Sequence, residues 1–221
     1  MSRAGRGALR PRAIAFDLDG TLIDSFADLA AAVNAARAAY ALAPLSLAEV
    51  RRHVGLGTET LVERTVPAPP GAGQDAYRRF AAEYDRCLLE TTRAYPGVED
   101  TLARLQSIPL GLITNKIQRH TEALLAGLGW GGRFALVLGG DALAARKPDP
   151  LPLRHFLEHV KCSPDAAAMV GDGVVDIRAG RAAGMATVAV TYGNTPAEVL
   201  AAERPDALLD RLTDLLDLIA L

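Results

Sequence analysis

The sequence predicts an α/β protein: a doubly wound, Rossmann-like parallel sheet core with an inserted all-helical domain near the N-terminal end. Three observations predict this fold. Short, continuously apolar runs recur along the chain, as is typical of strands buried on both faces. Amphipathic stretches alternate with most of these runs, which favours parallel strands joined by helices. After the first run, roughly 70 residues contain no convincing strand and predict helices only.

The apolar runs predict the strands of the core. They lie at 13–17, 110–114, 134–139, 167–171, 186–190 and, more weakly, 206–210. The amphipathic stretches between them predict helices at 98–107, 116–128, 150–161, 174–183 and 195–203. This alternation assigns residues 13–23 and 96–221 to one core domain.

The inserted helical domain is expected over residues 24–95. Ser25 is a plausible N-cap of its first helix, SFADLAAAVNAARAAYALA. Two shorter helices, SLAEVRRHV and TETLVERTV, are separated by GLG, and PAPPGAG at 67–73 is typical of a loop. The sequence QDAYRRFAAEYDRCLLETTRAY predicts a long last helix. Residues 1–12 are basic with no long apolar run after them, which predicts a flexible tail rather than a signal peptide.

The composition argues against several classes of protein. The 221 residues are 50% hydrophobic and carry a net charge of −2, so no basic field favours nucleic acid. No apolar stretch approaches the roughly 18 residues that a membrane helix needs. Cys87 and Cys162 lack metal-ligand spacing, and a reducing cytoplasm fits them. We expect a cytoplasmic monomer or homodimer with a small-molecule partner, and with neither nucleic acid nor membrane as partner.

Polar side chains follow four of the predicted strands, at the ends where ligands bind in a doubly wound sheet. In chain order they are Asp17 and Asp19, Thr114 and Asn115, Lys147, and Asp172 with Asp176. Clustered carboxylates bind a hard cation such as Mg²⁺. A lysine can neutralise a transferring phosphoryl group, and a carboxylate can act as its nucleophile. The pattern therefore predicts phosphoryl transfer at one edge of the sheet.

These residues resemble the four motifs of the haloacid dehalogenase superfamily. The motifs are DLDGTLIDS, TN, KP and GDGVVD, in that order, and the resemblance spans nearly the whole chain from Asp17 onward. It implies that the helical insert is the family's α-helical cap domain. It also implies a Mg²⁺-dependent phosphatase that hydrolyses a small phosphomonoester through an aspartyl-phosphate. Gly173 departs from the pattern, because relatives commonly carry a small hydroxyl residue there, and little loss of activity is expected.

The resemblance implies a role for each motif residue. Asp17 would be the nucleophile, and Asp19 the acid for the leaving oxygen and then the base for water. Mg²⁺ would be held by the Asp17 carboxylate, the Asp19 main-chain carbonyl and Asp172. The remaining implied roles are charge neutralisation by Lys147, support of the metal site or orientation of that lysine by Asp176, phosphoryl binding by Thr114 and the Asn115 amide, and a close turn at Gly20.

Within the superfamily, HVGLGTETLVERTV, TNK and the stretch from VTYGNTPAEVL onward resemble the phosphoglycolate phosphatase group. 2-Phosphoglycolate is therefore the expected substrate, and Gly55, Gly57 and Thr58 of the cap are candidate specificity residues. The two glycines could equally mark helix ends alone. Sugar-phosphate phosphatases and pyrophosphatases share parts of these cues. A phosphomutase is less favoured because RRHVGLGTET has no lysine, and a receiver-type signalling domain has no place for the insert.

Four further features favour ordinary structural roles. Lys116 is expected to be exposed, and at least two of Arg51, Arg52 and His53 to be solvated. The HFLEH sequence at 155–159 matches a zinc-peptidase pattern but lacks a third ligand in suitable context. Local packing explains Trp130 better than ligand stacking does.

Overall fold

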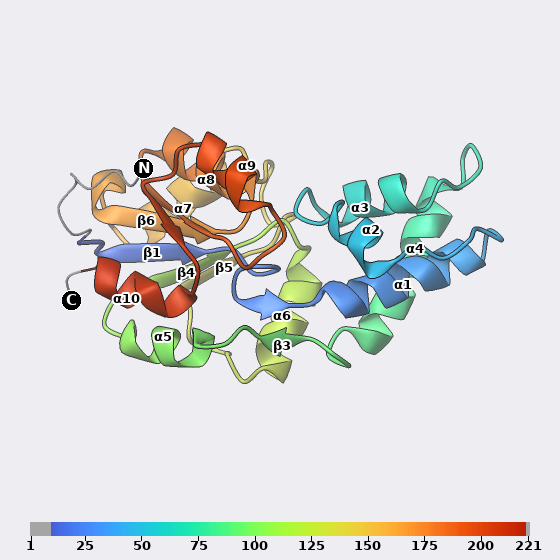
Figure 1. Cartoon of the computed structure of the whole chain (residues 1–221), viewed down its shortest axis with the longest axis horizontal. Coiled ribbons are helices and arrows are strands. Elements are labelled where there is room, and N and C mark those ends of the chain that lie inside the picture. Colours follow the sequence, from blue (N-terminus) through green and yellow to red (C-terminus); the bar gives the residue numbers. More distant parts are fainter. Residues whose placement is uncertain (1–9, 220–221) are drawn as a thin grey trace.

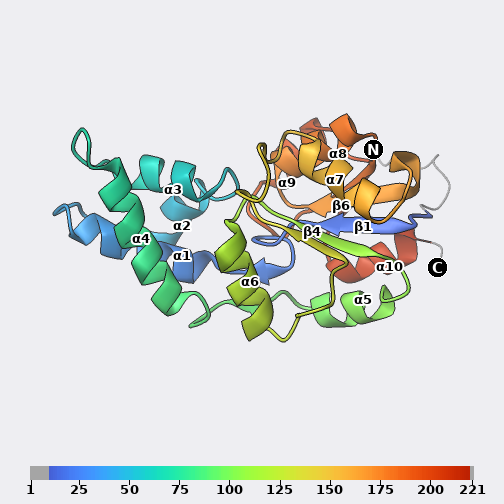
Figure 2. The ribbon, with the colours of Figure 1, turned by 180° about the vertical axis from the view of Figure 1, so that it is seen from behind.

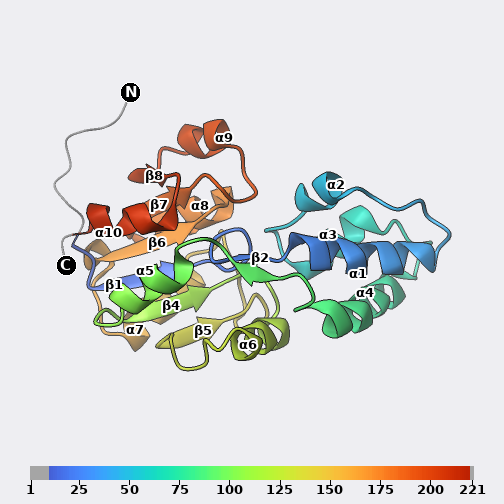
Figure 3. The ribbon, with the colours of Figure 1, turned by 60° about the horizontal axis from the view of Figure 1, so that its bottom comes forward.

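The computed structural model describes residues 10–219, so residues 1–9 of the predicted tail lie outside the described part. A six-stranded sheet forms the core in the order β5-β4-β1-β6-β7-β8 (Figures 1 and 3). Every pairing in it is parallel. The strands are β1 (Ala13–Phe16), β4 (Leu110–Ile113), β5 (Leu136–Leu138), β6 (Ala167–Gly171), β7 (Ala186–Val190) and β8 (Ala207–Leu209). Each coincides with a run predicted from the sequence.

Helices cover both faces of this sheet (Figures 1 and 2). Side chains alternate along β1, so Ile14 and Phe16 join the hydrophobic cluster on one face, whereas Ala13 and Ala15 join the cluster on the other. The first face is covered by α5 (Val98–Arg104), α6 (Gln118–Gly127), η2 (Leu212–Asp214) and α10 (Leu215–Leu218). The second is covered by α7 (Leu151–His159) and α8 (Val174–Ala183), with η1 (Pro164–Ala166) before β6 and α9 (Ala197–Ala202) beside α8. The predicted doubly wound core is confirmed.

The inserted helices form a cap with a hydrophobic cluster of their own, seen beyond one end of the sheet in Figure 1. The cap consists of α1 (Phe26–Ala38), α2 (Leu47–Arg51), α3 (Thr58–Thr65) and α4 (Gly73–Cys87). The last helix is shorter than predicted, because the chain leaves α4 after Cys87 and becomes extended before α5. The limits predicted for the two domains, 13–23 with 96–221 and 24–95, stay predictions.

The two connections between cap and core run side by side. β2 (Ile23–Asp24) pairs antiparallel with β3 (Arg93–Ala94), with Ile23 opposite Ala94. The expectation of no strand in residues 25–94 missed β3, because a two-residue strand leaves no periodic pattern. Beyond the pair, the buried carboxylate of Asp28 in α1 accepts hydrogen bonds from the main-chain N–H and hydroxyl groups of Thr91 and Thr92. These hydrogen bonds therefore hold the first helix of the cap against the segment through which the chain leaves the cap.

Candidate active site

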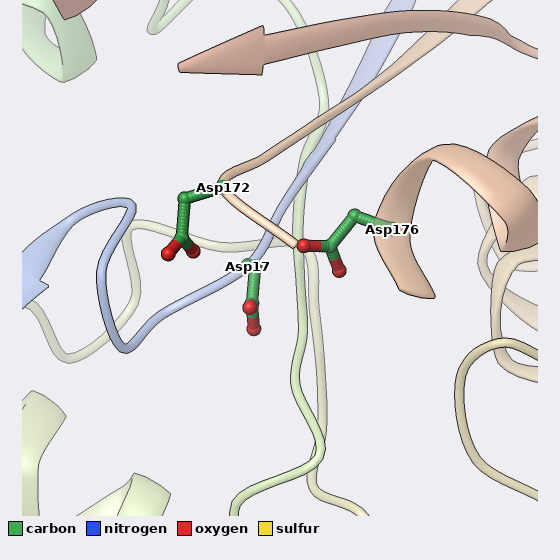
Figure 4. Close-up of side chains that lie close together, drawn as sticks. All are labelled: Asp17, Asp172 and Asp176. Atoms are coloured by element: carbon green, nitrogen blue, oxygen red, sulfur yellow. The ribbon is translucent and has the colours of Figure 1, made fainter. Parts of the chain in front are cut away.

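Three carboxylates lie close together at the C-terminal ends of two central strands of the sheet (Figure 4). Asp17 follows β1, Asp172 follows the neighbouring β6, and Asp176 lies in the first turn of α8. The register that pairs Phe16 with Val170 brings the two strand ends together. One oxygen from each carboxylate lies within 4.8 Å of the others, and all three side chains are buried. The sequence prediction that these residues meet is thus realised in the structure.

Lys147, from the loop after β5, is the cation of this cluster. Its Nζ lies 2.9 Å from Oδ1 of Asp17 and 2.6 Å from Oδ1 of Asp176. Burial alone would lower the pKa of Lys147, but the two carboxylates outweigh burial and raise it. The ammonium therefore stays charged and holds both acids.

Asp172 has neutral hydrogen-bond donors around it. Oδ1 accepts from the Thr21 hydroxyl at 2.9 Å, and Oδ2 accepts from the main-chain N–H of Asn194 at 2.7 Å. Burial, with the charges of Asp17 and Asp176, raises the pKa of Asp172 to about 8. Burial also raises the pKa of Asp176 to about 6, although Lys147 opposes the shift. For both groups burial is the largest cause, and the charge of Asp17 adds to it.

The charges and ligand atoms of this cluster fit a divalent hard cation. When all three carboxylates are ionised, the single ammonium leaves two negative charges, which are costly to bury. A divalent cation would offset both. All the side-chain donors are carboxylate oxygens, which Mg²⁺ and Ca²⁺ prefer. The residues present are therefore suited to hold the metal that the sequence implied.

The expectation that Lys116 is exposed is wrong. Its side chain is 3% exposed, and its Nζ lies 3.0 Å from Oδ2 of Asp19. Lys116 follows β4 at the sheet edge, where α4 of the cap covers it: its Nζ lies 4.7 Å from the centre of the Tyr84 ring. Helical periodicity within the cap does not reveal which core residues the cap covers, so the sequence carried no signal of this burial.

Ser25 is a second residue whose partner was not foreseen. It stands at the N-cap position of α1, as predicted, but its side chain makes no capping hydrogen bond. Its hydroxyl donates instead to Oδ1 of Asp19 at 2.5 Å. Asp19 is thus fixed by one hydroxyl and one ammonium.

Thr114 and Asn115 are buried at the end of β4. The side-chain Nδ2 of Asn115 donates to the main-chain oxygen of Gly55 in the cap and to that of Lys147, each at 2.9 Å. Asn115 therefore joins the cap to two core loops. Gly20 adopts φ +85°, and a Cβ there would lie 2.3 Å from Oδ2 of Asp172. Close approach of this carboxylate is thus one structural reason for glycine at position 20.

A small cavity lies between the core residues and the cap. Its volume is about 30 Å³, which holds only a few water molecules. The core contributes Asp17, Asp19, Thr114, Asn115 and Lys116, and the cap contributes Gly55, Gly57 and Thr58 among others. All three candidate cap residues from the sequence therefore line it. We call this space the chamber.

A second link between cap and core involves two residues that sequence reasoning did not place in the site. Asn194 donates its main-chain N–H to Asp172 and its Nδ2 to the main-chain oxygen of Arg51 at 2.6 Å. In return the Arg51 guanidinium donates to the oxygen of Gly193 at 3.1 Å and stacks over the Phe26 ring. Arg51 is thus engaged, whereas Arg52 is exposed. Only the polar GNT turn after β7 could have drawn attention to Asn194.

Two other features singled out in the sequence can be placed in the structure. Trp130 is fully buried, and its Nε1 donates to Glu99 at 2.6 Å. His155, Glu158 and His159 are exposed on α7. Among residues 10–219, the acidic cluster is the one group of three or more candidate metal ligands.

The site can be compared with known proteins. A profile described as haloacid dehalogenase-like hydrolase matches residues 11–184, which include the acidic cluster and Lys147. The chain belongs to the haloacid dehalogenase-like hydrolase family. This hydrolase is 41% identical over 215 residues to a Chromobacterium violaceum protein named phosphoglycolate phosphatase, with 94% of this chain and 96% of the relative covered. A Pectobacterium atrosepticum protein of the same name is 38% identical, with 94% and 92% covered.

Solved structures agree with the fold. The hydrolase resembles the crystal structure of a predicted phosphoglycolate phosphatase from Haemophilus somnus, with a TM-score of 0.87 and 32% identity over 96% of this chain and 99% of that chain. In the described part of this hydrolase, no helix has the length and apolar character needed to cross a membrane.

Proposed function

We propose that this hydrolase is a Mg²⁺-dependent phosphatase that converts 2-phosphoglycolate to glycolate and phosphate. The observation that carries the proposal is the buried cluster of Asp17, Asp172 and Asp176 with one lysine, beside a small chamber lined by residues of the helical cap. Relatives named phosphoglycolate phosphatase, about 40% identical over nearly the whole chain, support the substrate.

In the proposed reaction Asp19 first donates a proton and later accepts one. An oxygen of Asp17 attacks phosphorus, the bond from phosphorus to the ester oxygen breaks, and Asp19 gives its proton to that oxygen. Glycolate leaves, and an aspartyl-phosphate remains. Water then attacks phosphorus while Asp19 takes its proton, the bond from phosphorus to Asp17 breaks, and phosphate is released.

The other residues of the site bind Mg²⁺ and the phosphoryl group and neutralise its charge. Mg²⁺ would be held by the carboxylates of Asp17 and Asp172 and the main-chain carbonyl of Asp19, and would offset the charge of the phosphoryl oxygens. Asp176 orients Lys147, which its oxygen contacts at 2.6 Å. The Thr114 hydroxyl and an N–H of Asn115 bind phosphoryl oxygens. Because both contacts of Nδ2 go to protein carbonyls, the main-chain N–H of Asn115 is the donor we propose.

The small chamber favours a small leaving group over the alternatives. Sugar phosphates and pyrophosphate remain alternative substrates on this scaffold. A phosphomutase is disfavoured because no cap lysine lines the chamber in the described part of the chain. A receiver-type domain is disfavoured because the chain belongs to a hydrolase family. A cytoplasmic location and a monomeric or homodimeric state stay predictions.

The test uses a panel of phosphomonoesters with and without Mg²⁺. Wild-type protein is expected to release phosphate from 2-phosphoglycolate, to prefer it to hexose phosphates and pyrophosphate, and to lose turnover in a chelator. Asp17→Asn, with its fold checked by Trp130 fluorescence, should abolish turnover. Near wild-type activity of this variant would refute the mechanism. A roughly tenfold preference for a sugar phosphate, about 1.4 kcal/mol in transition-state binding, would overturn the substrate assignment.

A further inference from the structure

Lys116 is a buried cation that the proposed reaction does not use. Its Nζ contacts both carboxylate oxygens of Asp19, at 3.1 and 3.0 Å. The aromatic ring of Tyr84, from α4 of the cap, lies 4.7 Å away and favours a cation there. The side chain is therefore a fixed positive charge.

The charge of Lys116 is distinctive within the chamber. Among the described residues that line the chamber, Lys116 is the only cation. The cap wall that faces it is neutral and includes Leu29, Val54 and Thr58. Lys147 lies with Asp17 and Asp176 and is committed to them. A negative group on the leaving part of a substrate would therefore find its counter-charge at Lys116.

We propose that Lys116 binds the carboxylate of the substrate's leaving group and so selects phosphomonoesters that carry an anionic group next to the ester oxygen. This rests on the proposed function, in which Asp19 contacts the ester oxygen. In a phosphorylated 2-hydroxy acid, one carbon separates the ester oxygen from the carboxylate, so a carboxylate oxygen lies roughly 3 Å from it. That length matches the 3.0 Å between Asp19 and Lys116.

The donors of Lys116 permit this contact. An ammonium has three N–H donors, and Asp19 accepts at two positions. The Tyr84 hydroxyl is the other group that interacts with this ammonium. A substrate carboxylate would replace this neutral partner, because charge-assisted hydrogen bonds are the stronger ones. Tyr84 and Lys116 come from cap and core respectively, so the site is complete only when the cap lies against the core.

The test compares two substrates of similar size, 2-phosphoglycolate and 2-hydroxyethyl phosphate, which differ in the carboxylate. Wild-type protein and Lys116→Met are assayed with Mg²⁺ for kcat and KM on both. We expect kcat/KM for 2-phosphoglycolate to fall about 10- to 100-fold, the range for a lost hydrogen bond to a charged group. The fold-decrease in kcat/KM for 2-hydroxyethyl phosphate should be at least ten times smaller. Inhibition by the product glycolate should weaken in parallel.

Lys161→Met is the matched control, because it removes the same charge from an exposed lysine and should leave both values unchanged. An equal loss on both substrates would overturn the proposal, since Lys116 would then act only through Asp19. Should Lys116→Met not fold, Lys116→Gln carries the same comparison. If wild-type protein releases phosphate from neither substrate nor from p-nitrophenyl phosphate, the proposed function fails instead.

Discussion

Gly20→Ala tests whether close packing at position 20 holds Asp172 in place. Gly20 has φ +85°, and an added Cβ would lie 2.3 Å from Oδ2 of Asp172. An L-residue in this conformation costs about 1–2 kcal/mol, partly offset by about 0.4–1 kcal/mol of unfolded-state entropy. Displacing the carboxylate also breaks its hydrogen bonds with Thr21 and Asn194, each worth about 1.5–3 kcal/mol. We expect a destabilisation of about 3–7 kcal/mol with Mg²⁺ bound.

Gly71→Ala is the matched control. Gly71 has the same φ of +85° but nothing within 4 Å of an added Cβ, so it should cost only about 1 kcal/mol. Unfolding in guanidinium chloride, followed by the single Trp130, gives both values. The difference of about 3–6 kcal/mol, which comes from the two hydrogen bonds, corresponds to roughly 6–24 °C in Tm. It should shrink without Mg²⁺, because the displaced carboxylate then moves away from Asp17 and Asp176. Equal stability and equal Mg²⁺ affinity of the two variants would refute the reasoning.

Two further predictions follow from contacts around the cap. Asn194→Ala removes the hydrogen bond from the side chain to Arg51 but keeps the main-chain N–H on Asp172, so KM should rise several-fold with Mg²⁺ affinity unchanged; a fall in Mg²⁺ affinity alone would contradict this role. Burial lowers the pKa of His120 to about 4, below its usual 6.5, so the unfolded chain binds the proton first and stability falls as pH drops from about 6.5 towards 4. Comparing wild type with His120→Gln at pH 8 and pH 5 should show about 1–2 kcal/mol of this loss, and parallel pH profiles would contradict it.

Most of the core could be predicted because its strands are buried on both faces and leave continuous apolar runs. The predictions for β6 and β7 match the observed bounds, and the others differ only at the ends. The connecting strands β2 and β3 escaped because they are two residues long and are defined by their pairing with each other. The over-long prediction for α4 has the same origin, since residues 88–92 lead into that pairing.

The site residues also fall into those that the sequence could predict and those that it could not. Residues at strand ends, such as Asp17 and Asp172, could be placed because sheet topology brings such ends together. Contacts between cap and core could not be predicted, because they depend on the angle at which two separately packed units meet. Lys116, Ser25 and Asn194 all owe their partners to that arrangement. The roles of these residues in turnover stay predictions for the experiments above.

The β2–β3 pair has a consequence for how such proteins diversify. Paired strands lie about 4.8 Å apart, so the chain enters and leaves the cap at nearly the same point, with Ile23 opposite Ala94. The cap therefore occupies the position that the turn has in a β-hairpin, between the two antiparallel strands β2 and β3. An insertion of different length or shape can be exchanged at this junction without altering the register of any core strand. Cap residues that line the chamber, such as Thr58, can therefore change without moving the strand ends that carry the acidic cluster.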